Sequence, residues 1–278
     1  MEKSWLSSEL DKDLQLLASE EKPIGWFSLS AISNIPLISF PGMSKRECEE
    51  VLVQAQNVLR ISRNKNNYKE VAITYSVDDD NIENKYKTVI GEISSVYIMQ
   101  DEETKSLLEK ENQNDNLVVI SIHNHPNDGN FSVNDLFIYE KNPCIRLMEI
   151  VNRKGEVSFL YKPKHVDLKN IVLKNIIDVI PDFLQRKQNY EQNGKSLLSL
   201  SEILTLEERR QISKETIFDF QQHGVYFCQY VGKDKEDDVV FSQESTTVNI
   251  KSPLNSTIKL LSNCSFEDSE YECEREDY

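Results

Sequence analysis

The sequence predicts an α/β (α+β) fold, in which a mixed β-sheet is flanked by helices and followed by a C-terminal extension of helices and a hairpin. Two observations lead to this fold class. Between residues 44 and 163, helical periodicity and short β-rich runs follow one another, and one mixed sheet with helices on both sides accounts for all of them. From Val166 onward, the pattern changes to two helical segments and a further hairpin.

These changes of pattern divide the chain into four segments. Residues 1–43 form an N-terminal extension, and residues 44–163 form the principal domain. Residues 164–262 form a helical and hairpin region of unknown role, and residues 263–278 are an acidic tail that we expect to be disordered. With 278 residues, of which 38% are hydrophobic, the chain is long enough for one large or two modest domains with a real core.

The first elements lead into the principal domain. Residues 1–23 carry leucines at helical spacing and could form a short amphipathic arm, whereas residues 24–42 are β-rich but interrupted by prolines, which predicts an extended segment or a short strand. The clearest helix runs from Ser44 to Ser62, because Ser44 and Glu47 form a capping box ahead of an apolar face. We expect this helix to cover a sheet.

The strands of the sheet come next. Residues 70–77 alternate in hydrophobicity and predict a strand that starts at Glu70, on the face opposite to the aliphatic side chains. The runs TVIGEI and SVYIM, around Gly91, predict two short strands or one bent strand. Residues 100–116 predict a covering helix, and residues 117–122 form a continuous apolar run typical of a short buried strand.

A helix and a hairpin complete the principal domain, and the extension follows. The helix begins near Ser132, and the hairpin pairs residues 145–151 with residues 157–162 around Gly155, which can adopt a positive φ. In the extension, one helix is expected after Val166 up to the proline at 181, followed by a polar stretch.

A second helix is expected from about Ser201 to His223, with a capping box at Thr205 and Glu208 and with Gly224 just beyond its end. The runs VYFCQYV and DVVFS, joined by a charged turn, predict the last hairpin.

The composition excludes several classes of function. The formal net charge is −15, and a surface of that sign repels phosphate backbones, which disfavours general nucleic-acid binding. The five cysteines are scattered and lack any C-x-x-C pair, as expected of free thiols in a reducing compartment. Neither a signal-peptide pattern nor an apolar run long enough to span a membrane is present, so we expect a soluble cytoplasmic protein.

A candidate metal site follows the apolar run at residues 117–122. Because side chains alternate along an extended chain, His123 and His125 point the same way into the polar loop that follows. Asp135 lies ten residues after His125 and three after Ser132, where the next helix begins. Two imidazoles and one carboxylate are the ligand set of a catalytic zinc site with an open fourth position. The Ser-x-x-Asp pattern is also an ordinary helix-capping signal, and histidines at strand ends often only form hydrogen bonds.

This order of elements, with the string HNHPNDGNFSVND before a helix and a hairpin, resembles the JAMM/MPN (JAB-domain) metalloproteases. It is most similar to their RadC-like or phage-type bacterial branch, whose loops also contain H-N-H-P. The resemblance covers roughly residues 44–163. It implies a cytidine-deaminase-like core, one Zn²⁺ per chain, and a protein or peptide substrate that could be joined to a modifier through an isopeptide bond.

The resemblance also implies roles for individual residues. His123, His125 and Asp135 would be the zinc ligands, and Ser132 matches a serine that helps to stabilise the tetrahedral intermediate. Glu70 takes the place of the catalytic glutamate, which would accept a proton from the zinc-activated water and pass it to the leaving amine.

Three features of the sequence limit this prediction. Glu92 also lies upstream of the metal loop and competes with Glu70 for the role of general base. Asn124 stands where the deubiquitinase branch has Ser or Thr, and the loop before Asp135 is one residue shorter, so the resemblance does not name ubiquitin as the substrate. A non-catalytic binding or scaffold module of the same fold is the alternative, against which the three ligand types argue.

Overall fold

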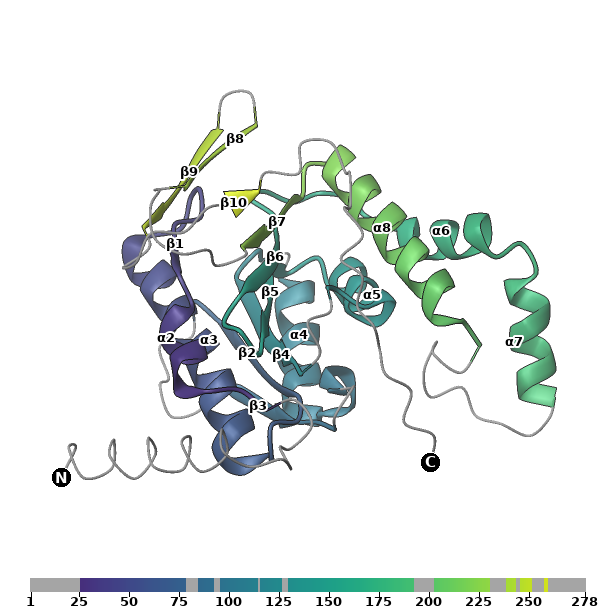
Figure 1. Ribbon diagram of the computed structural model, residues 1–278. Helices are drawn as coiled ribbons and strands as arrows, with labels where there is room; N and C mark the ends of the chain where they lie inside the picture. Colours follow the sequence, from purple (N-terminus) through teal and green to yellow (C-terminus); the bar gives the residue numbers. More distant parts are fainter. Residues whose placement is uncertain are drawn as a thin grey trace.

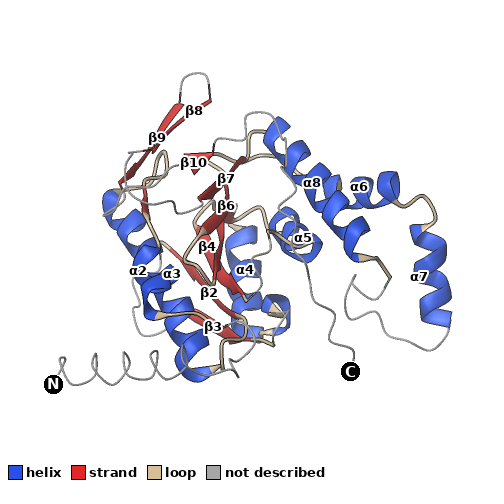
Figure 2. Cartoon of the chain, in the orientation of Figure 1, coloured by secondary structure: helices blue, strands red, loops and turns tan. Residues whose placement is uncertain are grey.

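The computed structural model describes residues 26–78, 85–92, 96–114, 116–126, 130–192, 203–230, 239–243, 246–251 and 258–259. It confirms the α+β fold class, with a mixed sheet flanked by helices (Figures 1 and 2). In sheet order, the strands are β10 (Ile258–Lys259), β7 (Tyr226–Tyr230), β6 (Val157–Tyr161), β5 (Ile145–Asn152), β4 (Val119–His125), β2 (Val71–Ser76) and β3 (Lys87–Ile90). Only β4 and β5 pair in parallel, and the other neighbours are antiparallel.

One face of the sheet is covered by α3 (Lys45–Lys65), the helix that the capping box predicts. The Ser44 hydroxyl accepts a hydrogen bond from the Glu47 N–H, and the Glu47 carboxylate accepts one from the Ser44 N–H. Aliphatic residues of the helix pack against Ile73, Tyr75 and Ile122 of the sheet. Burial of this apolar face is what holds α3 on the sheet.

The opposite face carries the remaining helices of the core. These are α4 (Glu102–Gln113), α5 (Val133–Lys141), α6 (Ile171–Val179) and α8 (Leu206–Gln222). They enclose a second apolar cluster, which includes Val119, Met148 and Leu160 on the sheet. Helices α6 and α8 pack together, and α7 (Phe183–Gln192) extends from α6 at the outer end of this layer (Figure 1). The predicted metal ligands lie on this face.

Packing crosses the predicted segment boundaries on both sides of residues 44–163. Residues from 27 to 40, including α2 (Leu29–Asn34) and β1 (Leu37–Ile38), contribute buried side chains to the cluster beneath α3. Beyond residue 163, β7 joins the same sheet as β6, with Phe159 opposite Cys228. The segments on either side of residues 44–163 therefore share its core.

Several predicted elements differ from the observed ones. The stretch 24–42 contains the short helix α2, and the polar stretch after residue 181 contains α7, whose weak apolar face left it unrecognised. The described residues of SVYIM, 96–99, do not form a strand: residues Ile98–Gln100 form a 3₁₀ turn instead. Hairpin 145–162 is confirmed, and Gly155 has φ +78°, where an added Cβ would lie 2.1 Å from the Ala31 carbonyl oxygen.

The predicted pairing of VYFCQYV with DVVFS is wrong. Strand β7 pairs with β6 and β10, whereas β8 (Val239–Gln243) pairs with β9 (Thr246–Lys251) in a separate sheet that also contains β1. Pairing with β6 places β7 in the main sheet, where Cys228 and Tyr230 join the buried core.

Some expectations concern residues outside the described part. The amphipathic arm at residues 1–23 and the acidic tail at residues 263–278 both lie there. Among the cysteines that the structure describes, Cys48, Cys144 and Cys228 are buried free thiols. In the same part of the chain, no helix combines the length and apolar character needed to cross a membrane.

Candidate metal centre

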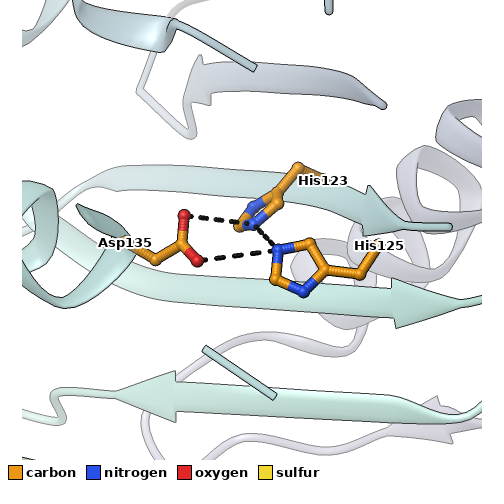
Figure 3. Close-up of side chains that lie close together, drawn as sticks. All are labelled: His123, His125 and Asp135. Atoms are coloured by element: carbon orange, nitrogen blue, oxygen red, sulfur yellow. Dashed lines mark hydrogen bonds and ion pairs between the residues drawn. The ribbon is translucent and has the colours of Figure 1, made fainter. Parts of the chain in front are cut away.

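The three predicted ligands meet on the face of the sheet that α5 covers, where β4 ends and α5 begins (Figure 3). His123 is fully buried and His125 is partly buried, and both lie within the last three residues of strand β4 rather than in the loop after it. Asp135 is the third residue of α5 and is 8% exposed. Alternation along β4 directs both imidazoles to one face, toward the helix that carries the carboxylate.

The separations between these side chains are close to those of tetrahedral coordination, with one Asp135 oxygen near each histidine and one ligand atom from each residue within 4.8 Å of the others. The two histidine Nε2 atoms are 3.1 Å apart, the His123 Nε2 lies 3.4 Å from Asp135 Oδ1, and the His125 Nε2 lies 3.6 Å from Asp135 Oδ2. Ligand atoms bonded at 2.0–2.1 Å to a tetrahedral ion lie about 3.3–3.4 Å from one another. The three residues can therefore hold one metal ion without moving far.

Asp135 is oriented by its place in the helix. The Ser132 N–H donates to Asp135 Oδ2 at 2.7 Å, and the Asp135 N–H donates to the Ser132 Oγ at 3.2 Å, which completes a capping box. The predicted helix cap and the predicted ligand are thus the same carboxylate. Since its second oxygen, Oδ1, faces His123, capping leaves Asp135 able to bind an ion.

Charge complementarity holds this carboxylate in its ionised form. Burial by itself raises the pKa of Asp135, but the nearby imidazoles of His123 and His125 outweigh that effect, and the pKa lies well below its usual value. The site therefore offers a carboxylate and not a carboxylic acid. The other ring nitrogen of His123, Nδ1, is buried and has no hydrogen-bond partner in the described part of the chain, so Nε2 is the ring atom that the protein uses.

Glu70 lies immediately before β2, beside this cluster. Ala72 pairs with His123 across the β2–β4 ladder, and Glu70 is two residues earlier, so its side chain leaves the sheet on the face of the histidines. It is 6% exposed, and burial raises its pKa to about 8, while His125 lowers that pKa and Asp135 raises it. Both ligands are thus close enough to act electrostatically on the Glu70 carboxyl.

The competing glutamate has a different environment. The Glu92 side chain is 71% exposed and pairs with Lys69 Nζ at 2.5 Å. Only its backbone approaches Glu70, whose N–H donates to the Glu92 carbonyl at 2.9 Å. Of the two candidate bases, Glu70 is the one that the fold brings to the histidines and the aspartate.

For one residue of the site, the sequence predicted no structural role. Asn124 lies between the two histidines and is 1% exposed, with its side chain on the face of the sheet that α3 covers. Its amide contacts the backbone on both sides of Glu70. The only signal in the sequence was its position between two candidate ligands, because its partners lie more than 50 residues away along the chain.

The chain was also compared with known proteins. No family model, no curated protein and no solved structure matches it. The similarity to the JAMM/MPN metalloproteases therefore depends on the motif and on the order of elements. The structure itself shows a buried His-His-Asp group that could hold a metal ion.

Proposed function

We propose that this protein is a zinc-dependent hydrolase of the JAMM/MPN type, which cleaves a peptide or isopeptide bond. The observation that carries the proposal is the meeting of His123, His125 and Asp135 at tetrahedral spacing, with Glu70 buried on the same face. Two imidazoles and one carboxylate that lie within 3.6 Å of one another supply three ligand atoms for a single ion.

Zinc is the ion that this donor set favours. Two imidazole nitrogens and one carboxylate oxygen suit a borderline-soft ion that accepts tetrahedral geometry, whereas Mg²⁺ and Ca²⁺ prefer six or more oxygen ligands. Three protein ligands also leave the fourth position of a tetrahedron open, as in catalytic zinc sites. When bound, zinc supplies Lewis acidity, which lowers the pKa of a water and polarises a carbonyl group.

Glu70 is the proton carrier in this proposal. Its carboxyl is buried and faces the ligand cluster, and the charge of an ion held by His123, His125 and Asp135 would lower the raised pKa of Glu70 and favour the carboxylate. That carboxylate could then accept a proton from the attacking water and deliver it to the departing nitrogen. The O–H bond of water and the C–N bond of the substrate break, a C–O bond forms, and the proton leaves on the amine. Burial keeps bulk water from competing for that proton.

Ser132 has the donor that the developing oxyanion needs. Its Oγ accepts the Asp135 N–H, and its own hydroxyl hydrogen is not used by the capping box. The residue is exposed, so a substrate can reach it. Removing one such donor costs about 10²–10³ in rate in comparable sites.

The test begins with the metal content of the full-length protein. We expect about one zinc per chain after purification without chelators, and loss of that zinc when His125 is replaced by alanine. Hydrolysis is then measured with fluorogenic linear peptides and lysine-branched isopeptides. Glu70→Gln should retain zinc and lose hydrolysis, whereas Glu92→Gln, an acid paired outside the site, should keep both.

The outcomes separate the possible functions. A wild type without stoichiometric metal would refute the proposal. Stoichiometric zinc with no hydrolysis of either substrate class would instead favour a binding or scaffold module. Where hydrolysis is present, equal rates for the Glu70→Gln variant and the wild type would remove Glu70 from the mechanism. Capture of a protein by the Glu70→Gln variant and not by His125→Ala would then identify the substrate.

A further inference from the structure

We propose that Asn124 is a positioning residue, which fixes Glu70 next to the metal centre by clamping the two peptide groups that flank it. The proposal rests on the function above, because it gives Glu70 a position that matters for catalysis. The hydrogen bonds themselves are a property of the fold.

The clamp consists of both polar atoms of one side-chain amide. Asn124 Oδ1 accepts the N–H of Val71 at 2.8 Å, and Asn124 Nδ2 donates to the carbonyl of Lys69 at 3.3 Å. Lys69 and Val71 are the residues directly before and after Glu70. A single buried amide therefore bridges the backbone on either side of the proposed base.

The other two polar atoms of these peptides are held from different elements. The Glu70 N–H donates to the Glu92 carbonyl, and the Glu70 carbonyl accepts from Gly91 N–H at 2.8 Å and from Asn66 Nδ2 at 2.8 Å. All four backbone groups around Glu70 are thus satisfied, which restricts movement of this segment at the start of β2.

Asn124 also links this segment to α3. Its Nδ2 lies 3.3 Å from Ser62 Oγ, and the Ser62 hydroxyl donates to the Lys69 carbonyl at 2.6 Å. Between α3 and β2, the chain turns through Asn67 and Tyr68 at positive φ values of 47° and 63°, a conformation that side chains rarely adopt. Contacts at the end of the turn must hold it there, and Asn124 supplies two of them.

Position along β4 explains why this residue can couple the ligands to the base. Asn124 lies between His123 and His125, but its side chain leaves the opposite face of the sheet. The backbone that presents both imidazoles to the metal is the same backbone that anchors the peptides of Glu70. A change in the amide therefore moves the base relative to the ligands without removing a ligand.

The test compares Asn124→Ala with a matched control, Ser121→Ala. Ser121 lies on the same strand, is also buried, and joins the same two strands through a 3.0 Å hydrogen bond to Thr74, but it does not touch the peptides of Glu70. We expect both variants of the full chain to bind one zinc. Asn124→Ala should lower kcat by about 10–100-fold with little change in KM, as a small misplacement of a catalytic group does, whereas Ser121→Ala should stay within about twofold of the wild type.

A second readout does not depend on activity. Hydrogen exchange at the Val71 amide, measured by NMR, should be faster in Asn124→Ala than in Ser121→Ala, because only the first variant removes the acceptor of that N–H. Asn124→Asp keeps an acceptor for Val71 and loses the donor to Lys69, so it should restore part of both the exchange protection and the rate. This variant also serves if the alanine variant fails to fold.

Each result decides a separate point. Equal kcat values for the Asn124 and Ser121 variants, in an active wild type, would overturn the positioning role. Equal exchange at Val71 would show that the clamp does not hold this peptide, and would overturn the proposal as well. A zinc-loaded wild type without hydrolysis would refute the proposed function and the catalytic role of the clamp, and faster Val71 exchange would then mark the amide as purely structural.

Discussion

The substitution Glu149→Gln tests whether the folded protein keeps a buried carboxyl group protonated at neutral pH. Glu149 lies in the middle of β5, pairs with Ile122 and Phe159 across the sheet, and is 2% exposed. Its Oε2 atom has no hydrogen-bond partner in the described part of the chain. Burial raises the pKa of Glu149 from 4.5 to about 8, so the folded protein keeps this carboxyl protonated at neutral pH.

The direction of the pH effect follows from that shift. The folded state binds the Glu149 proton more tightly than the unfolded state, so protonation of Glu149 stabilises the folded protein. This contribution to the free energy of unfolding is complete below pH 4.5 and is lost as the pH rises toward about 8. One pKa unit corresponds to about 1.4 kcal/mol, so the loss across about three pH units is roughly 4 kcal/mol. That is a large part of the total stability of an ordinary domain, about 5–15 kcal/mol.

The assay is urea unfolding of the wild type and of Glu149→Gln at several values between about pH 5 and pH 8. Glutamine is neutral throughout this range, so the variant should gain stability relative to the wild type by roughly 4 kcal/mol from the lower to the higher pH. Any constant cost of burying the new amide group cancels in this difference. A free-energy difference that does not change with pH would show that Glu149 ionises normally, and would refute the reasoning.

Three further predictions concern α5 and its N-cap residue. Asp135→Asn retains a side chain that can cap the helix but removes the anionic ligand. Zinc content should therefore fall at least tenfold by metal analysis, while the melting temperature of the metal-free protein stays within a few degrees. Ser132→Ala should instead keep zinc and lose about 1 kcal/mol of stability in urea unfolding. Glu140 accepts the N–H groups of Asn170 at 3.1 Å and of Val172 at 2.7 Å, at the start of α6, so Glu140→Ala should cost about 2–3 kcal/mol; an unchanged urea midpoint would show that α6 is held without this cap.

The local signals in the sequence were reliable because they involve neighbours. The capping boxes at Ser44, Ser132 and Thr205 all form, since each needs only contacts within one turn of a helix. The alternation that directs His123 and His125 to one face is likewise a property of one extended strand. These features required no knowledge of the rest of the fold.

The failures have the opposite origin. Strand β7 was assigned to a hairpin with the next run, but it pairs with β6, more than 60 residues earlier, because that ladder buries both strands in the main sheet. Helix α7 was missed because it buries little beyond Phe183 and therefore lacks a strong apolar period. In both places, tertiary partners outweighed the local pattern.

The sequence by itself determined the three candidate ligands and the helix start that orients one of them, because strand alternation and helix capping are local. Only the tertiary structure decided how Glu70 lies relative to them, since that depends on β2 pairing with β4 across about fifty residues of intervening chain. It also showed the amide of Asn124 bridging the peptides around Glu70. Hydrogen bonds between distant segments leave no periodic trace in a sequence, and the fold must form before they can be seen.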